Sequence, residues 1–342
     1  MAREKVLTAA GPADPERQRD FALRPKFLRE VIGQRQVAER LAIAVAASKK
    51  LNEPLGHILF DGPPGLGKTT FATVLPNELG TSIQLTSGPA LTKPADLLPY
   101  LTNLEHGGIL FIDEIHRMPR VVEEFIYPAM EDFRIDIVLG EGVNARTINM
   151  KLKPFTLIGA TTRGGMLSGP MRDRFKMREH LDYYSIEELA EIVRVNAKKL
   201  DTAIATEATI EIARRSRGTP RVANARLHWA RIFSVATTAE GNISEVLAKA
   251  ALDKQEVDPM GLDKNDRRYL ETLIEVFSGG PTGVEAIAAT MNIASDTLSD
   301  EIEPYLLREG YLIRTPRGRV ATAKGFAVFG KTPPKGNTLF DC

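Results

Sequence analysis

Several common sequence features are missing from the chain, and each absence excludes some classes of protein. The 342 residues contain a single cysteine, Cys342, which is the last residue. One cysteine cannot build a disulfide framework or a cysteine-based metal site within a chain, which fits a protein of the reducing cytosol. Residues 1–20 are polar and lack the apolar core of a signal peptide. No apolar run is long enough to span a membrane, so we expect a cytoplasmic protein.

The chain also lacks an excess of either charge. Its 45 Lys and Arg against 44 Asp and Glu leave a formal net charge of +1 at pH 7. A balance this close produces no global field that would attract nucleic acid, so any basic surface must be local. The length predicts two or three domains, and the apolar share of 43% is sufficient for their cores.

The chain does contain a glycine-rich phosphate-binding motif. Residues 62–69 have the pattern G-x-x-x-x-G-K-T, after a short apolar run at 57–60 and before a stretch at 70–75 that can open a helix. Strand, glycine loop and helix form the context that this motif requires. The glycines let consecutive N–H groups point at a phosphate, and the following helix adds the positive end of its dipole.

Side chains of the same motif suit ATP and Mg²⁺. Lys68 can reach the β- and γ-phosphates, and the hydroxyl of Thr69 can ligate Mg²⁺. Gly65, Gly67 and Thr70 complete the nucleotide-binding residues that we expect in the loop.

A second motif consists of an apolar run that ends in two carboxylates. The run 108–116 includes Asp113 and Glu114 at the end of its apolar part. An acid at the end of a buried strand is costly unless a positive charge meets it, and Mg²⁺ beside the phosphate loop would do so. We expect Asp113 on the metal side and Glu114 as the base that polarises water. The alternative is an acidic pair that caps the next turn.

Two further segments carry residues that suit nucleotide hydrolysis. The apolar run 155–162 ends in Thr161 and Thr162, and a hydroxyl there can sense the γ-phosphate or hold the attacking water. Residues 171–175 contain two arginines, which form either a solvated face or, in a ring-forming ATPase, the arginine finger that reaches a neighbouring subunit.

The segment before the phosphate loop has two interpretations. Leu23 and Ile32, with Arg24 nearby, can wrap over the base of a nucleotide, or they can belong to ordinary core packing. Within the helix after the loop, Pro76 costs about 3 kcal/mol in an interior position. We expect this helix to reach Leu79, with a kink or an early end at the proline.

Residues 134–152 predict an inserted β-hairpin with a long loop. Apolar residues alternate along both arms: Ile135, Ile137 and Leu139, then Ile148, Met150 and Leu152. If the hairpin projects, this row is exposed and indicates a partner site. Alternatively, the row packs on the parent domain.

Beyond residue 184 the pattern is helical up to about residue 257. Four helices are expected, with their starts signalled at Ser185, Thr206, Thr219 and Ser244. The second of these should end near Gly218, and the third places Arg221 in its first turn, where it can point at a nucleotide.

The C-terminal residues predict a winged helix. Helices are expected over 263–277, 283–291 and 295–308, followed by strands over 311–314 and 319–322. The last helix carries four acids, Asp296, Asp300, Glu301 and Glu303, which would repel DNA and make base reading unlikely by charge. The hairpin instead carries Arg314, Arg317 and Arg319, which suit contacts with phosphates. The alternative is a winged helix that contacts protein.

Taken together, the motifs resemble the RuvB family, the bacterial Holliday-junction branch-migration motors of the AAA+ class. The resemblance covers about residues 21–335 and rests on Gly62–Thr69, Phe111–His116, Pro128–Asp132, Asp136–Gly142, Gly159–Arg163, Arg172–Phe175, Arg217–Arg221 and Arg314–Arg319. It implies an ATP-driven motor that migrates Holliday junctions in recombination and repair. The motor would form a hexameric ring on duplex DNA and work with RuvA and RuvC.

The resemblance also implies roles for single residues. Thr162 resembles the first sensor, Arg174 the finger that acts in trans, and Arg221 the second sensor. Other positions match residues that line the nucleotide: Leu23, Arg24, Glu131, Asp132, Phe133 and Tyr184. The hairpin resembles the RuvA-docking insertion, through Ile148 and Met150. The chain departs from the family pattern at Pro76 and at Lys176, which replaces a glycine.

We therefore expect an α/β chain: an AAA+ P-loop ATPase domain over 1–184 with a flexible start, a helical lid over 185–257 and a winged helix over 258–342 with a disordered tail from 333. Two other classes remain. A protein-remodelling AAA+ ATPase would need a substrate-gripping pore loop and gives no reason for the basic wing. An ATP-switched transcription regulator conflicts with the acidic recognition helix.

Overall fold

The computed structural model describes residues 23–139, 146–238 and 241–334. The chain divides after Tyr184 into two compact units, which are treated separately below. The expected flexible start over 1–20 lies outside the described residues, as does most of the expected disordered tail. The second unit includes both the four-helix segment and the winged helix.

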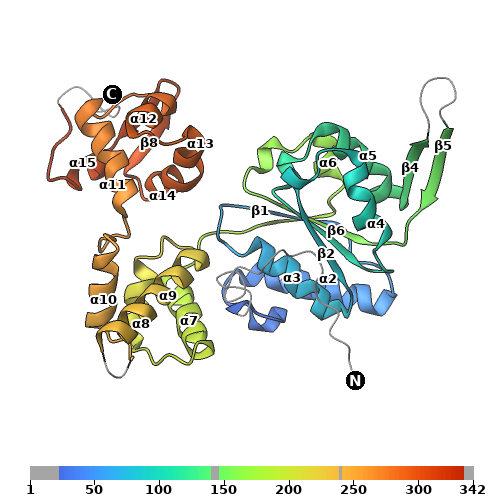
Figure 1. Ribbon diagram of the computed structural model, residues 1–342, viewed down its shortest axis with the longest axis horizontal. Helices are drawn as coiled ribbons and strands as arrows, with labels where there is room; N and C mark the ends of the chain where they lie inside the picture. Colours follow the sequence, from blue (N-terminus) through green and yellow to red (C-terminus); the bar gives the residue numbers. More distant parts are fainter. Residues whose placement is uncertain (1–22, 140–145, 239–240, 335–342) are drawn as a thin grey trace. The chain divides into compact units, whose positions relative to one another are not determined.

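The first unit is built on a five-stranded parallel sheet with the order β2-β3-β6-β1-β7 (Figure 1). Its strands are β1 (Ile58–Asp61), β2 (Ile83–Ser87), β3 (Ile109–Asp113), β6 (Thr156–Thr161) and β7 (Met177–His180). Three of them, β1, β3 and β6, coincide with the apolar runs of the sequence, whereas β2 reads Ile-Gln-Leu-Thr-Ser and has no continuous apolar run. The edge strand β7 was not predicted, because Arg178, Glu179 and His180 leave it without a continuous apolar run.

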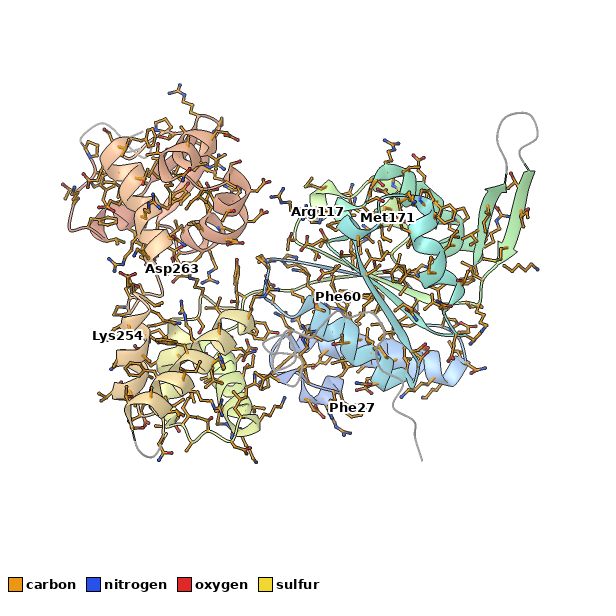
Figure 2. All side chains as sticks on the ribbon, in the orientation of Figure 1. Phe27, Phe60, Arg117, Met171, Lys254 and Asp263 are labelled. Atoms are coloured by element: carbon orange, nitrogen blue, oxygen red, sulfur yellow. The ribbon has the colours of Figure 1, made fainter. Side chains whose placement is uncertain are left out.

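Helices cover both faces of this sheet (Figure 1). On one face lie α2 (Arg35–Leu51) and α3 (Lys68–Leu79), and on the other α4 (Leu98–Thr102), α5 (Arg120–Asp132) and α6 (Gly169–Asp173). Phe60 of β1 stacks on Phe71 of α3 with ring centroids 5.7 Å apart, near the centre of the unit (Figure 2). Alternate strand residues thus serve two cores, as expected for a sheet covered on both sides.

Two helices bear on the predictions for prolines. The phosphate-loop helix α3 passes through Pro76 and ends at Leu79, with Gly80 as its left-handed cap at φ 70°. The expected early end at Pro76 is therefore wrong. Residues 94–102 form a 3₁₀ turn, Pro94–Leu97, followed by α4, whose first turn contains Pro99.

The inserted hairpin consists of β4 (Arg134–Leu139) and β5 (Arg146–Lys151), which pair antiparallel. Part of its apolar row packs on the parent domain, and part is exposed. Ile135 is fully buried, and Met150 is one of the half-buried residues packed against the core. Ile148 is 49% exposed.

The second unit begins with the four predicted helices, α7 (Ile186–Lys199), α8 (Thr206–Arg214), α9 (Pro220–Thr237) and α10 (Glu245–Lys254). Ser185 and Glu188 form the expected capping box, and Thr219 and Ser244 cap the third and fourth helices. The second helix ends at Arg214, before the expected Gly218, and Arg217 adopts a left-handed φ of 54°.

The winged helix follows with α11 (Lys264–Glu271), α12 (Val284–Met291), α13 (Ser295–Thr297), α14 (Glu303–Arg308), β8 (Leu312–Thr315), β9 (Gly318–Ala321) and α15 (Ala323–Ala327). A π-helical turn, Thr272–Val276, extends α11, and another, Leu298–Ile302, joins α13 to α14. The single recognition helix expected over 295–308 is thus three short segments, with Pro304 in the first turn of the last.

Candidate functional site

The five parallel strands end in polar residues at one edge of the sheet: Asp61, Ser87, Asp113, Thr161 and His180. Asp61 is in register with both Thr161 and His180, and Ser87 with Asp113. The segments that follow these strands therefore meet at the carboxyl edge. Open α/β sheets bind ligands at this edge.

The phosphate loop has the backbone that its glycines predict. Gly62, Gly65 and Gly67 have φ values of 134°, 81° and 101°. A Cβ atom on Gly62 would lie 2.5 Å from the carbonyl oxygen of Leu181, so a side chain is excluded there. The loop leads directly into α3, whose first turn carries Lys68.

Lys68 folds back into the loop. Its Nζ donates to the carbonyl oxygens of Gly62 at 2.7 Å and Pro63 at 2.8 Å, and the residue is only 7% exposed. Thr69 and Thr70 follow in the first turn and are half-buried. The ammonium group is therefore already held where the loop curves around a phosphate.

The acidic pair follows β3. Glu114 is left-handed at φ 47°, and its own N–H donates to Asp113 Oδ1 at 3.0 Å. The Glu114 side chain forms no capping hydrogen bond to the 3₁₀ turn Ile115–Arg117, so this acid is not the cap that the alternative expected. Gly88 makes this bend possible, because a Cβ there would lie 2.3 Å from the Glu114 carbonyl oxygen.

The two threonines after β6 have different partners. Thr162 Oγ1 donates to Glu114 Oε2 at 3.2 Å. Thr161 is fully buried, and its hydroxyl lies 2.9 Å from His116 Nδ1. His116 Nδ1 also lies 3.3 Å from Glu114 Oε2. The structure therefore brings Thr162 into contact with Glu114, the expected base, and Thr161 into contact with His116.

No role was predicted for His116, which stands two residues after Glu114. Its side chain is 5% exposed and contacts both the acid and the buried threonine. It can thus orient the Glu114 carboxylate.

The segment before the phosphate loop, for which base binding and core packing are the two alternatives, lies beside the phosphate-loop helix. The backbone N–H of Leu28 donates to Glu78 of α3 at 2.8 Å, and Asn77 of α3 donates to the Lys26 carbonyl at 3.0 Å. Tyr184 lies at the other end of α3, where its hydroxyl donates to the Leu66 carbonyl of the phosphate loop at 3.1 Å.

Other residues near the start of the chain take part in this packing. Leu23 is 8% exposed, and Arg24, beside it, is half-buried. The contacts of Lys26 and Leu28 therefore place this segment on the last turn of α3, as the core-packing alternative expects.

The residues also suit a magnesium ion carried with the nucleotide. Thr69 starts the loop helix and Asp113 ends the strand beside it, and Asp113 takes part in none of the ion pairs among the described residues. Those residues contain no cluster of three His, Cys, Asp or Glu side chains fit for a metal. Mg²⁺ is usually held by one or two protein ligands together with phosphates, which agrees with this arrangement.

Arg174 lies at the opposite edge of the sheet. It caps the end of α6, three residues before Met177, where β7 begins. The N–H of Met177 bonds to the carbonyl of His57, just before β1. Parallel strands start at one edge and end at the other, so Arg174 and the loop after Asp61 are separated by the length of the strands.

Part of the expected nucleotide-lining segment 131–133 lies at this amino edge as well. The Phe133 ring is 6.5 Å from that of His57 and 5.8 Å from that of Phe155. Glu131 Oε1 is 2.9 Å from Arg174 Nη2, and Asp132 pairs with Arg134 at 3.4 Å. Within one chain, Phe133 and Arg174 are thus not brought to the phosphate loop.

His57 stabilises the amino edge as a neutral side chain. Its Nε2 donates to the Met130 carbonyl and its Nδ1 accepts from the Leu157 N–H, both at 2.9 Å. Burial lowers the pKa of His57, which keeps the imidazole uncharged. Lys176, the departure from the family pattern, is exposed and does not enter this core.

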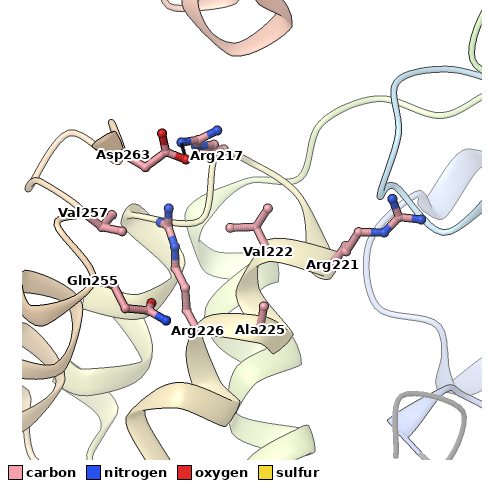
Figure 3. Close-up of a pocket in the computed structure, with 8 residues that line it drawn as sticks. All are labelled: Arg217, Arg221, Val222, Ala225, Arg226, Gln255, Val257 and Asp263. Carbon is pink, nitrogen blue, oxygen red and sulfur yellow. Dashed lines mark ion pairs between the residues drawn. The ribbon is translucent and has the colours of Figure 1, made fainter. Parts of the chain in front are cut away.

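In the second unit, Arg221 lies exposed in the first turn of α9. It borders a pocket of about 530 Å³ and points away from the other residues that line it (Figure 3). On the far side of the pocket, Arg217 pairs with Asp263 at 2.5 Å and also with Asp266. These pairs join the loop before α9 to the start of the winged helix.

Two charged groups of this junction are deeply buried. Arg226 is 5% exposed, and burial lowers its pKa to about 9. Asp266 has no exposed surface, and burial raises its pKa to about 7 although Arg217 opposes the shift. Burying these two charged groups costs desolvation free energy, and the ion pairs of Arg217 offset part of this cost.

The wing is the hairpin formed by β8 and β9, and two of its three arginines form hydrogen bonds within the domain. Glu303 is fully buried and accepts from Tyr269 Oη at 2.8 Å, Arg319 Nε at 2.8 Å and Arg314 Nε at 3.0 Å. Glu303 therefore does not face DNA, which corrects its place among the four repelling acids. Asp296, Asp300 and Glu301 are exposed.

The three arginines thus differ in exposure. The side chain of Arg319 is 18% exposed and that of Arg314 is 48% exposed. Arg317 lies exposed in the turn between β8 and β9. Arg317 is therefore the wing arginine best placed for a phosphate.

None of the described helices has both the length and the apolar character needed to cross a membrane.

Three family models match successive parts of the chain. The RuvB P-loop domain of Holliday junction DNA helicases matches residues 23–181, the RuvB AAA lid domain 184–258, and the RuvB C-terminal winged helix domain 259–330. A curated relative from Rhodopirellula baltica, the Holliday junction branch migration complex subunit RuvB, is 59% identical over 315 residues, which cover 92% of this chain and 86% of the relative.

Solved structures agree with these matches. The Thermotoga maritima RuvB Holliday junction branch migration motor has a TM-score of 0.83 and 44% identity, covering 92% of this chain and 100% of its own. A mutant of the same protein has a TM-score of 0.84 and 45% identity, covering 91% of this chain and 99% of its own. The chain, with its phosphate loop, lid and winged helix, belongs to the RuvB family of P-loop ATPases.

Proposed function

We propose that the chain is an ATP-driven motor that moves Holliday junctions by branch migration during recombination and repair. The observation that carries this proposal is the division of the hydrolytic residues between two edges of one sheet. Lys68, Asp113, Glu114 and Thr162 follow the carboxyl ends of strands, whereas Arg174 lies just before the start of β7. Complete sites then form only between subunits, as in a ring.

At the carboxyl edge the chain supplies binding and proton transfer. Lys68 holds the β- and γ-phosphates, and Thr69 and Asp113 would hold Mg²⁺, which supplies charge neutralisation on the phosphates when bound. Glu114 accepts a proton from the attacking water. Thr162, hydrogen-bonded to Glu114 at 3.2 Å, senses the γ-phosphate and couples its presence to the base.

At the amino edge the chain supplies residues to its neighbour. Arg174 carries a planar and permanent charge that can stabilise the phosphoryl group during transfer. Glu131, Asp132 and Phe133 reach the same neighbouring nucleotide. By analogy with the family resemblance, we propose that six subunits close into a ring around duplex DNA.

The lid transmits the state of the nucleotide. Arg221, exposed at the start of α9, binds the nucleotide of its own subunit. Arg217, four residues earlier, is bonded to Asp263 and to the Gly261 carbonyl at 3.1 Å. Rotation of the lid is therefore carried to the winged helix through side-chain ties within the second unit.

The winged helix and the inserted hairpin supply the contacts with partners. Arg317, with Arg314 beside it, contacts DNA phosphates without reading the sequence. Ile148, exposed on β5, docks RuvA, together with Met150, which lies two residues further along the same face of the strand. The Rhodopirellula baltica relative is named as a subunit of a branch migration complex, and we extend that assembly, including RuvC, to this chain.

Branch migration of a synthetic four-way junction tests the proposal directly. Purified chain with ATP, Mg²⁺ and RuvA should convert the junction to duplex products, whereas the Lys68→Ala variant should not. A chain that hydrolyses ATP equally with and without DNA, and leaves the junction intact with RuvA present, would refute the motor function.

A further inference from the structure

One face of α5 carries a stripe of three residues, of which the proposed function uses only Glu131. Glu123, Tyr127 and Glu131 follow one another at intervals of four, which places them on the same side of the helix. Each of the three contacts α6 or the residues at its ends, Ser168 and Arg174. The stripe therefore positions the segment that ends in Arg174.

The start of α6 is fixed through the hydroxyl of Tyr127. Ser168 caps α6 by accepting the N–H of Met171 at 3.2 Å, and it donates to Glu123 Oε1. Tyr127 Oη donates to the same carboxylate oxygen at 2.5 Å and lies 3.1 Å from Ser168 Oγ. Burial and the bond to Glu123 raise the pKa of Tyr127, so its hydroxyl stays a donor.

The end of α6 is fixed through the ring of the same tyrosine. The guanidinium carbon of Arg174 lies 3.9 Å from the centroid of the Tyr127 ring, a cation–π contact. Arg174 Nη1 also donates to the Pro170 carbonyl at 2.7 Å. The Glu131 side chain is 55% exposed, so its ion pair with Arg174 is of the weak surface kind. The ring is thus the rigid surface that sets the plane of the guanidinium.

We propose that Tyr127 is a positioning residue for Arg174, acting through its aromatic face, with Glu123 and Ser168 holding the ring in place. The inference rests on the proposed role of Arg174 as a finger. A planar fork must meet the transferring phosphoryl group edge-on, and misplacement of a catalytic group by about 1 Å can cost about a hundredfold in rate. Tyr127 supplies that orientation before the neighbouring subunit arrives.

Two substitutions separate the ring from the hydroxyl. Tyr127→Leu removes the aromatic face, and Tyr127→Phe keeps it. ATP turnover of the assembled protein should fall about tenfold in Tyr127→Leu, with unchanged affinity for a fluorescent ATP analogue, and by no more than about threefold in Tyr127→Phe. Phe125→Leu, which changes another half-buried aromatic residue of α5, is the matched control and should stay near the parent rate.

Two further measurements distinguish positioning from loss of folding. Tyr127→Leu combined with Arg174→Ala should be no slower than Arg174→Ala alone, because both remove one contribution. Mixing Tyr127→Leu with Lys68→Ala should restore part of the turnover, because some interfaces then pair an intact Lys68 with an intact Tyr127.

The outcomes separate this inference from the function beneath it. Multiplying defects in the double variant, or turnover in Tyr127→Leu at the parent rate while Arg174→Ala is defective, would overturn the role of Tyr127 alone. Normal turnover in Arg174→Ala would remove the finger itself, and with it the reason for a positioning residue.

Discussion

Arg319 and Glu303 meet at the base of the wing, where Arg319 Nε donates to Oε1 at 2.8 Å and Glu303 has no exposed surface. The contact joins β9 to α14 and supports a buried carboxylate. The hydrogen bonds from its arginines hold the pKa of Glu303 below its usual value against the effect of burial. An arginine of the wing can therefore be needed for folding as much as for DNA.

We expect the wing arginines to behave differently when replaced. Arg317→Ala should weaken binding to duplexes of unrelated sequence about equally and reduce the slope of log affinity against log salt by about 1, because one phosphate contact is lost. Fluorescence anisotropy at several salt concentrations measures this slope. An unchanged slope would place the DNA contact elsewhere in the chain.

Arg319→Ala should instead lower stability. Removing one partner of a buried ion pair costs about 3 kcal/mol, since Glu303 would keep only Arg314 and Tyr269. Urea unfolding of Arg319→Ala and Arg317→Ala compares the two. Equal stability of both variants would contradict the structural role of Arg319.

Hydrolysis should separate from nucleotide binding at the acidic pair. Glu114→Gln removes the proton acceptor and keeps the shape, so turnover should fall by about 10² to 10⁴ with ATP still bound. Lys68→Ala should lose binding or turnover because its ammonium group meets the phosphates. Turnover and nucleotide binding are measured on the same preparations, and near-normal turnover of Glu114→Gln would exclude it as the base.

The finger should act in trans. Arg174→Ala should bind ATP and lose about 10³ to 10⁵ in turnover. Mixing it with Lys68→Ala should return part of the activity, because some interfaces regain both residues. If mixed rings form and stay inactive, the trans assignment fails; a defect in Arg172→Ala and not in Arg174→Ala would identify the other arginine.

Replacing Ile148 and replacing Met150 in the hairpin should have different effects. Ile148→Ser should leave the thermal stability unchanged and abolish stimulation by RuvA, because Ile148 is 49% exposed. Met150→Ser should lower stability by about 1 kcal/mol, because its half-buried side chain packs on the core. Thermal unfolding and RuvA-dependent branch migration together test both; destabilisation by Ile148→Ser would show that it belongs to the core.

The buried acid of the lid junction predicts a dependence on pH. Burial raises the folded-state pKa of Asp266 to about 7, above its ordinary value of about 3.9. Between these values the folded chain keeps a proton that the unfolded chain has lost, so this group's contribution to stability falls as pH rises from about 4 to 7 and is constant above. Urea unfolding at pH 5 and pH 8 should show a smaller difference in Asp266→Asn than in the parent chain.

The sequence predicted the elements whose information is local. The loop 62–69 needs its glycines wherever it occurs, and three strands, β1, β3 and β6, follow apolar runs of the sequence. Caps such as Ser185 with Glu188 are likewise complete within four residues. These features require no knowledge of distant neighbours, which is why they were predicted correctly.

What the sequence could not give are the pairings made by tertiary packing. Glu303 resembles any solvated acid of a helix until Arg319 and Tyr269 enclose it. The stripe through Tyr127 has ordinary helical spacing, and its contacts with the two ends of α6 are visible only in the folded structure. The edge strand β7 has no apolar run because only Glu179 within it is buried, and Arg40 from α2 pairs with that acid.

The separation of Arg174 from Lys68 across the sheet has a consequence for counting. In an open row of subunits, the last phosphate loop has no finger opposite it, so a row of n subunits holds n − 1 complete sites. Closing the row adds one subunit contact without adding a subunit, and the number of sites becomes n. The rate of hydrolysis per subunit therefore reports whether the assembly has closed around its DNA.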